Sequence, residues 1–202
     1  TTSPADVTVE CSASSAPSAT GTAVASDNCD SDVAITYSDT TISGVGNNSS
    51  IVRLWTATDD NGNATTYTQT ITVVDTTAPT FTTSPASVTV ECSASSAPSA
   101  TGTAVASDNC DSDVTIAYAD TTVAGVGNNS VITRVWTATD DNSNAATYTQ
   151  TITVVDTTAP TFITSPANVT VECSASSAPS ATGTAAATDN CDTSVAITYA
   201  DT

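Results

Sequence analysis

The sequence repeats itself every 81 residues, and this period limits the folds that the chain can adopt. Two cysteines in each copy keep the interval: Cys11 with Cys92 and Cys173, and Cys29 with Cys110 and Cys191. About 70 of the 81 positions are identical between residues 1–81 and 82–162, and a third copy runs about half way, to residue 202. A unit of this length exceeds a solenoid coil or a propeller blade and suits one small β-sandwich. We expect repeats at 1–79 and 80–160, and the N-terminal half of a repeat at 161–202.

The residue types within one copy favour strands over helices. Thr, Val and Ile are abundant, and β-branched side chains suit a pleated surface. Alternating segments predict strands, which we name by their place in an immunoglobulin-like sandwich: A at 7–9, B at 21–25, C at 33–37, a short middle strand at 40–42, F at 51–58 and G at 67–74. Trp55, in the F segment, is expected to fill the core. The predicted class is all-β, with tandem immunoglobulin-like β-sandwich repeats.

The composition excludes several functions. The chain has no Lys or His, its only cationic side chains are Arg53 and Arg134, and its net charge is −19. Two cations cannot neutralise a phosphate backbone, so nucleic acid is not an expected partner. No window approaches the roughly 18 apolar residues that a membrane span requires. Without imidazole, zinc sites and catalytic triads lack their usual ligand or base, and we do not expect an enzyme.

Five ordered motifs in each full copy resemble the hyalin repeat (HYR) family. In the first copy they lie at residues 7–11 (VTVEC), 17–23 (PSATGTA), 26–30 (SDNCD), 55–59 (WTATD) and 70–79 (TITVVDTTAP). That family consists of tandem immunoglobulin-like modules of extracellular and cell-surface proteins, common in bacterial surface arrays. The resemblance implies the fold and an extracellular or cell-surface location, and it brings no catalytic residues. Family members often carry further cysteines near the start of strand A and at the F–G turn; here Thr and Asn stand in those places, so a second bridge is not expected.

The acidic residues gather in two loops and in the connector between copies. In a seven-strand sandwich the B–C and F–G loops lie at the end where the chain enters. Here the B–C loop, residues 27–32, and the F–G loop, residues 59–63, are rich in Asp and Asn, and Asp75 follows strand G in the connector. The connector of one copy should therefore meet the two loops of the next copy. Several carboxylates within a few ångströms repel one another unless a cation lies among them.

We hypothesise that Ca²⁺ binds at each junction and stiffens it, because many hard oxygen ligands without imidazole or free thiolate select calcium over transition metals. The candidate ligands of the first junction are Asp75, Asp108, Asp111, Asp113, Asp140, Asp141 and Asn142, with Glu10 as a further ligand from strand A. Those of the second junction are Asp156, Asp189 and Asp192, with Glu91. The matching loop residues of the first copy are Asp27, Asp30, Asp32, Asp59 and Asp60. The alternative is that these are ordinary turn residues, which cap their own backbone and keep the surface soluble.

Two cysteines per copy at fixed places, without a C-x-x-C motif, indicate disulfides and an oxidising compartment. The simpler pairing joins Cys11 to Cys29 within a copy, and it is the first expectation. If strand A is long, however, these two cysteines lie at opposite ends of the module, too far apart for a bridge. The alternative joins neighbouring copies, Cys11 to Cys110 and Cys92 to Cys191.

Near-identical copies placed end to end suit a component whose value is its length. We predict an extracellular or cell-surface structural protein that forms a stiff stalk, fibre or filament, with further copies of itself as partners in a longer array. Because the sequence stops within the third copy, we expect more chain after it, or complementing strands from another subunit. The alternative is a cell-surface adhesin or carbohydrate-binding module for surface glycans, which needs exposed aromatic residues or an open calcium site. Sequons for N-glycosylation occur at Asn47, Asn48, Asn63, Asn128 and Asn168, about as many as chance predicts in a chain so rich in Ser and Thr.

Overall fold

The computed structural model describes residues 2–201, and the chain folds as two compact units. Unit 1 holds the residues up to Ser84 together with Ala104–Tyr118 and Trp136–Tyr148. Unit 2 holds Pro85–Thr103, Ala119–Val135 and the residues from Thr149 onward. Each unit therefore contains one connector between copies, together with loop residues of the copy that follows it.

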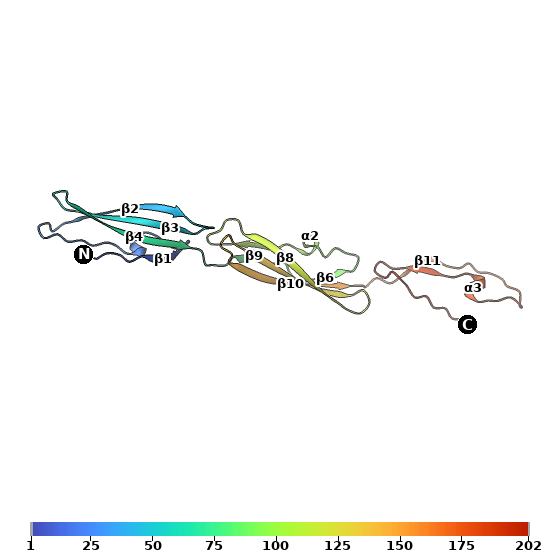
Figure 1. The fold of residues 1–202 in the computed structure, drawn as a ribbon. Coiled ribbons are helices and arrows are strands. Elements are labelled where there is room, and N and C mark those ends of the chain that lie inside the picture. Colours follow the sequence, from blue (N-terminus) through green and yellow to red (C-terminus); the bar gives the residue numbers. More distant parts are fainter. Residues whose placement is uncertain (1, 202) are drawn as a thin grey trace. The chain divides into compact units, whose positions relative to one another are not determined.

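The first copy builds a four-stranded sheet in unit 1 (Figure 1). Its strands, in sheet order, are β1 (Val7–Glu10), β4 (Ala64–Val74), β3 (Ser49–Thr58) and β2 (Ala34–Ser43). Strands β2, β3 and β4 are antiparallel, whereas β1 pairs with β4 in parallel, from Val7 opposite Ile71 to Glu10 opposite Val74. Strand β1 therefore ends beside the end of β4, where the connector to the second copy begins.

Strand β2 is continuous where two separate strands were predicted, at 33–37 and 40–42. Its ten residues pair with β3 without interruption, from Ala34 opposite Thr58 to Ser43 opposite Ser49. Asp39, at the expected break, lies opposite Arg53 and forms an ion pair with it, with Oδ1 2.8 Å from Nε. This cross-strand ion pair allows the polar residue Asp39 to continue the strand.

The segment before β2 also differs from the prediction. The expected B strand at 21–25 is a single bridge in the first copy, between Thr2 and Val24, although the second copy forms β7 (Val105–Ser107). Ahead of it, Pro-Ser-Ala-Thr forms one helical turn, α1 (Pro17–Thr20). Proline suits the first helical position because the N–H that it lacks has no partner there in any helix.

The buried side chains of the first sheet include polar ones. Trp55 is 5% exposed, so its predicted place in the core is confirmed. Gln69 is fully buried beside it and accepts a hydrogen bond from Trp55 Nε1 at 3.2 Å. Its own Nε2 donates to the backbone oxygens of Ala5 and Thr20, both at 2.8 Å, so the amide ties β4 to the segment that precedes β1 and to the last residue of α1.

Arg53 is also buried, with 1% of its surface exposed. Its Nε and Nη2 donate to the two carboxylate oxygens of Asp39, both at 2.8 Å. Nη1 donates to Thr20 Oγ1 at 3.0 Å, and Nη2 also donates to the Ser15 backbone oxygen at 2.8 Å. The guanidinium carbon lies 4.7 Å from the centre of the Tyr37 ring. Arg53 therefore joins β2, β3 and the α1 turn, a role that its sequence context did not predict.

The second copy repeats this arrangement, and the predicted all-β class is confirmed. Its four-stranded sheet has the order β6 (Val88–Glu91), β10 (Ala145–Val155), β9 (Ser130–Thr139) and β8 (Thr115–Ala124), with β6 again parallel to β10. A two-stranded sheet pairs β5 (Thr80–Thr83) with β7, and α2 (Pro98–Thr101) matches α1. Phe81 of β5 packs against Tyr148 of β10, with ring centres 6.0 Å apart.

The third copy contributes β11 (Thr161–Thr164), which pairs with β12 (Ala186–Thr188), and the single turn α3 (Pro179–Thr182). Its residues 169–172 match β1 in sequence but form no strand among the described residues, and Val169 and Val171 are exposed. In the first two copies this strand forms against β4 or β10, and the sequence contains no counterpart of these strands in the third copy. Among residues 2–201, no helix has the length and apolar character needed to cross a membrane.

Candidate cation site

The B–C and F–G loops meet at one end of each of the first two copies. In the second copy, Asp111 accepts a hydrogen bond from Asp141 N–H at 3.0 Å across the two loops, and one from Asp113 N–H at 2.8 Å within the B–C loop. In the first copy, Asp30 accepts the corresponding bond from Asp60 N–H at 2.9 Å. The acidic residues of the two loops therefore share one end of the module.

Three aspartates of unit 1 come together at the first junction. Asp75 follows β4, Asp108 lies in the B–C loop of the second copy and Asp140 lies in its F–G loop. One carboxylate oxygen of each lies within 4.8 Å of the others. Only 5% of the surface of Asp75 and 6% of that of Asp140 is exposed, so both residues are largely shielded from water. We call this group the Asp75 cluster.

Two oxygens of the Asp75 cluster are buried without a hydrogen-bond partner, Oδ2 of Asp75 and Oδ2 of Asp108. Burial raises the pKa of Asp75, and the negative charges of Asp108, Asp140 and Glu10 raise it further, although a hydrogen bond from Thr77 N–H lowers it. A buried carboxylate oxygen without a donor carries a large desolvation cost. These two oxygens are therefore placed to bind a positively charged ligand.

The backbone of Asp75 is held from both sides of the junction. Its N–H donates to Asn48 Oδ1 of the first copy at 2.9 Å, and its carbonyl oxygen accepts a hydrogen bond from Asn144 Nδ2 of the second copy at 3.2 Å. Its Oδ1 accepts the bond from Thr77 N–H at 3.2 Å. Asn48 and Asn144 were not among the predicted site residues. The signal available for Asn48 is its place in the GVGNN motif, which recurs at residues 125–129.

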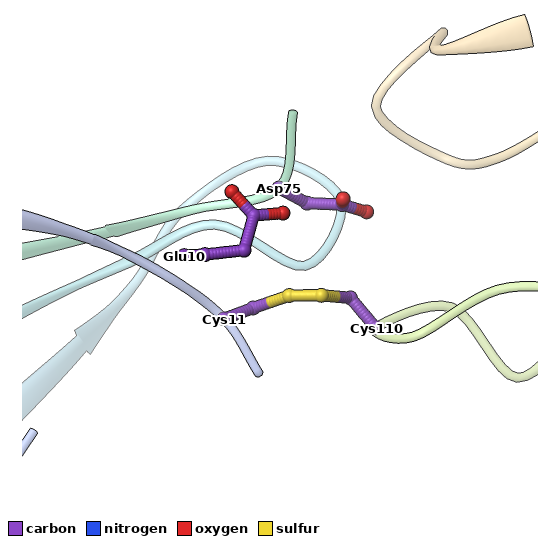
Figure 2. Close-up of side chains that lie close together, drawn as sticks. All are labelled: Glu10, Cys11, Asp75 and Cys110. Carbon is purple, nitrogen blue, oxygen red and sulfur yellow. A yellow bond between two sulfur atoms is a disulfide. The ribbon is translucent and has the colours of Figure 1, made fainter. Parts of the chain in front are cut away.

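Glu10 adds a fourth carboxylate beside the Asp75 cluster (Figure 2). Its side chain, that of Asp75 and the sulfurs of Cys11 and Cys110 offer ligand atoms within 4.8 Å of one another. The carboxylate accepts hydrogen bonds from the N–H and hydroxyl of Thr76, at 3.0 and 2.9 Å, and from the Thr77 hydroxyl at 2.9 Å. The bond from Thr76 N–H is the main reason that the pKa of Glu10 is lowered, so this carboxylate stays ionised. Glu10 therefore holds the connector and places a negative charge next to Asp75.

Disulfides join consecutive copies: Cys11 is bonded to Cys110 and Cys92 to Cys191, each with Cα atoms 5.9 Å apart. The first expectation, a bridge from Cys11 to Cys29, is wrong, and Cys29 and Cys173 carry free thiols. Strand β1 places Cys11 beside Val74, to whose oxygen it donates a backbone hydrogen bond of 2.8 Å. The loop of Cys29 instead contacts residues 59–63, at the opposite end of β4 and roughly 33 Å away at 3.3 Å per residue. A disulfide requires Cα atoms within about 7 Å, so only the neighbouring copy can supply the partner.

The second junction, in unit 2, also brings three aspartates and one glutamate close to a disulfide. Asp156, Asp189 and Asp192 offer oxygens within 4.8 Å of one another, and Glu91 and Asp156 lie as close to the sulfurs of the Cys92–Cys191 bridge. Asp189 Oδ2 is buried without a partner, as is the matching oxygen of Asp108. A hydrogen bond from Thr157 N–H is the largest cause that lowers the pKa of Glu91, to about 2. Acidic groups and a disulfide therefore lie together at both junctions, but the third aspartate differs, because Asp192 matches Asp111 and not Asp140.

Comparison with known proteins identifies the repeats. The family described as "HYR-like domain with 4 cysteines" matches residues 1–73 and again residues 80–154. The chain belongs to this family. Each HYR-like repeat here holds two cysteines, and the bonds that they form run between repeats.

Two protocadherin structures match parts of the chain at low similarity. A crystal structure of protocadherin gamma C5 EC1-3 has a TM-score of 0.26 and 14% sequence identity over 76% of this chain and 55% of that one. A protocadherin gammaB7 EC3-6 cis-dimer structure has a TM-score of 0.26 and 16% identity over 64% of this chain and 42% of that one. The chain thus spans about half the length of these structures. No curated protein matches the sequence.

The remaining candidate ligands of the first junction lie outside the Asp75 cluster. Asp111 uses both carboxylate oxygens to bind the backbone of its own HYR-like repeat, through Asp113 and Asp141. The side chains of Asp113 and Asp141 are exposed. Asn142 Oδ1 accepts a hydrogen bond from Asn47 N–H at 2.9 Å, so it contacts the preceding repeat through that bond. These residues shape the loops, whereas Asp75, Asp108 and Asp140 form the cluster.

The loops of the first HYR-like repeat do not form a corresponding cluster within the described chain. Asp27 accepts bonds from the N–H groups of Cys29 and Asp30, and Asp59 accepts bonds from Asn61 and Asn63. Residues of both loops, among them Asp30 and Asp60, line a hollow of about 270 Å³. Asp32 donates its backbone N–H to Asp30 Oδ1 at 2.8 Å. No group of three acidic ligand atoms gathers there among residues 2–201. The reason is that the third carboxylate of a cluster comes from the connector of a preceding repeat.

Proposed function

We propose that this chain is an extracellular structural repeat protein in which Ca²⁺, bound at the junctions between HYR-like repeats, joins them into a stiff stalk, fibre or filament. The observation that carries the proposal is the Asp75 cluster, where three carboxylates from two repeats converge and two of their buried oxygens have no hydrogen-bond partner. Like charges at such distances repel strongly in a site with little water. A divalent cation would remove that repulsion and satisfy the orphaned oxygens.

The ligand chemistry favours calcium. Ca²⁺ takes six to eight oxygen ligands from carboxylates, carbonyls and water in a flexible geometry. The Asp75 cluster offers carboxylate oxygens, and Glu10 lies beside it. The nearby cysteines are bonded to each other and the chain has no His, so the soft ligands that hold zinc or copper are absent from the described junctions. Asp75, Asp108 and Asp140 would hold the ion, and a bound ion would tie the connector to both loops of the next repeat.

The disulfides support the location and the stiffness. Structural disulfides persist in oxidising compartments such as the cell exterior. Cys11–Cys110 lies next to Glu10 and Asp75, so the first junction has a covalent tether and a candidate ionic tether close together. Two tethers at one junction restrict rotation about the connector far more than one. The proposed role is mechanical and involves no catalytic step.

The test is a calcium titration of the full chain after treatment with a chelator. We expect saturable binding, a rise in melting temperature with calcium concentration and, in small-angle X-ray scattering, a pair-distance distribution typical of a less flexible chain. Asp108→Asn should weaken binding at the first junction by at least about tenfold, since it removes a charge from the cluster. The matched control is Asp113→Asn, an exposed aspartate in the same loop, which should leave binding unchanged. Absence of calcium binding, or an equal effect of the two substitutions, would refute the proposal.

A further inference from the structure

The tip of the β2–β3 hairpin, residues 44–48, contacts the F–G loop of the second repeat, residues 140–144, within unit 1. Asn47 N–H donates to Asn142 Oδ1 at 2.9 Å. Gly46 faces the same side chain: a Cβ at this position would overlap Asn142 Oδ1 and lie 3.0 Å from Asn142 Cγ and 3.1 Å from the Asp141 carbonyl oxygen. The absence of a side chain on Gly46 therefore makes room for Asn142.

The F–G loop has its shape without help from the hairpin tip. Asp140 Oδ1 accepts hydrogen bonds from the N–H groups of Asn142 and Asn144, at 2.9 and 2.8 Å. The first repeat has the same bonds from Asn61 and Asn63 to Asp59, at 3.0 and 2.7 Å, although no preceding repeat contacts its loop in the described chain. Asn142 is thus presented by a preformed loop, and the hairpin tip is shaped to receive it.

The same hairpin tip also holds a member of the Asp75 cluster. Asn48 Oδ1 accepts the hydrogen bond from Asp75 N–H at 2.9 Å, while the neighbouring Asn47 N–H binds Asn142. Asn142 in turn donates its N–H to Asp140, a second member of the cluster. Adjacent residues of one tip therefore hold both the connector and the loop of the next repeat.

We propose that the hairpin tip, residues 44–48, is a docking surface for the F–G loop of the following HYR-like repeat. The place of Asn142 against Gly46, which we call the seat, then sets the distances between the carboxylates of the Asp75 cluster. The partner that fits this surface is a loop of the pattern Asp-Asp-Asn-x-Asn, in which the first Asp orders the loop and the first Asn enters the seat. The second half of the proposal rests on the proposed calcium function; the docking itself does not.

The second repeat supplies a matched control for Gly46. Gly127 occupies the same place in the same GVGNN motif and has nearly the same backbone angle, φ +66° against +61°. No described atom lies within 4 Å of a Cβ built at Gly127. Alanine at either position meets the same backbone strain, and alanine at Gly46 alone meets Asn142. The difference between the two substitutions therefore isolates the docking contact.

The experiment measures the stability of the Cys11–Cys110 bridge in the full chain, with chelator present and with Cys29 and Cys173 replaced by Ser. In a glutathione buffer the bridge exchanges with two glutathione thiols, giving two protein thiols and one glutathione disulfide, and mass spectrometry of alkylated peptides counts each bridge. We expect Gly46→Ala to lower the equilibrium constant for forming the Cys11–Cys110 bridge from its two thiols about tenfold and to leave that of Cys92–Cys191, the internal reference, unchanged. Gly127→Ala should leave Cys11–Cys110 unchanged. Equal effects of the two substitutions on Cys11–Cys110 would overturn the docking surface.

A second pair of variants keeps the test decisive if Gly46→Ala does not fold. Asn142→Ala removes the acceptor from the seat, and Asn61→Ala removes the matching side chain of the first repeat, which is exposed. Asn142→Ala should lower the equilibrium constant for forming the Cys11–Cys110 bridge severalfold, and Asn61→Ala should leave it unchanged. The same result for both would again contradict the proposal.

Calcium titration of the same variants separates this inference from the proposed function. We expect Gly46→Ala and Asn142→Ala to weaken calcium binding at the first junction more than their controls do. If the unsubstituted chain binds no calcium while the bridge still responds to Gly46→Ala, the docking surface stands and the calcium function fails. If calcium binds and the bridge does not respond, the docking surface fails.

Discussion

Asp75 combines two properties that conflict in the absence of a cation. It is almost fully buried, and three other carboxylates raise its pKa together with that burial. A folded-state pKa above the unfolded value means that the native chain binds a proton more readily than the unfolded chain. Without a cation, the contribution of Asp75 to stability therefore falls as pH rises through its raised pKa.

Asp75→Asn should consequently have opposite effects with and without calcium. In chelator at neutral pH, the amide removes the buried charge and should raise the free energy of unfolding by about 1–2 kcal/mol. In saturating calcium it should lower the melting temperature relative to the unsubstituted chain, because the proposed calcium site loses a ligand. Thermal denaturation under the two conditions measures both signs. A lower melting temperature in chelator would contradict the electrostatic account.

The lowered pKa of Glu91 predicts that the second junction loses stability in acid. Its pKa, lowered to about 2 chiefly by the hydrogen bond from Thr157 N–H, lies below the ordinary value of 4.5. Its stabilising contribution is therefore present above about pH 4.5 and is lost as pH falls towards 2. Glu91→Gln should make the melting temperature less dependent on pH across this window. The control is Glu172→Gln, the matching position of the third copy, where no strand forms; equal flattening by that variant would count against the assignment.

At the level of residues, sequence reasoning predicted that acidic groups meet at the junction, since turn residues could be assigned to one end of a sandwich. It could not separate Asp75 from Asp111, because both are aspartates in acidic segments. The difference arises from hydrogen bonds: both oxygens of Asp111 accept backbone N–H groups, whereas one oxygen of Asp75 accepts none. Such pairing depends on loop conformation, which spacing does not determine.

Among the elements, β3 is the one whose composition is least expected. The alternation of its side chains places Arg53 on the same buried face as Trp55. The ion pair with Asp39 and the bonds to Thr20 and Ser15 satisfy the guanidinium there. A charged residue at an interior position of an alternating strand has no signal in hydropathy, and only the cross-strand register with Asp39 explains it.

Arg53→Met should destabilise the first repeat by about 2–4 kcal/mol, because Asp39, Thr20 and Ser15 lose a buried donor that methionine cannot replace. Chemical denaturation followed by tryptophan fluorescence measures the change, in a background in which Trp136→Phe leaves Trp55 as the reporter. The double variant Arg53→Met with Asp39→Leu should recover part of the loss, since it leaves no uncompensated carboxylate. A loss below about 0.5 kcal/mol would indicate that the network contributes little.

The strands also explain why the bridge was first predicted within one repeat. Sequence separation makes Cys11 and Cys29 neighbours, and the parallel register of β1 with β4 is what moves Cys11 to the other end. Parallel pairing of a first strand with a last strand is a long-range contact that local pattern does not reveal. The position at which β1 ends decides between the two pairings, and the sequence alone does not locate it.

In the molecule as a whole, the scarcity of cations has a simple consequence. Arg53 and Arg134 are the only Lys or Arg residues, and each is 1% exposed within a central strand. Trypsin cleaves after these residue types and requires several residues of extended, accessible chain. The folded protein should therefore be cut at least about 10³-fold more slowly than the unfolded chain, in line with the free energy of opening. Digestion of native and denatured samples, resolved by mass spectrometry, tests this, and rapid native cleavage after Arg53 would show that the strand opens locally.

The 81-residue period made the fold class predictable for the whole chain, because a unit of that size and composition has few architectures open to it. It also identified each connector as a place where two copies meet. What the period could not supply is which residues of one copy contact the next, since every copy carries the same motifs. Gly46 and Gly127 show this most clearly: their sequences agree and their surroundings do not.

The two bridges shorten the covalent path along which tension would travel. Because Cys11 is bonded to Cys110 and Cys92 to Cys191, the route from Cys11 to Cys191 passes only through residues 92–110. Fully extended, that segment reaches about 65 Å, against roughly 600 Å for all the residues from 11 to 191. Pulled by its ends, the oxidised chain should be nearly inextensible even when sheets come apart, and reductant should release the hidden length. Single-molecule force measurements with and without reductant would read this difference directly as contour length.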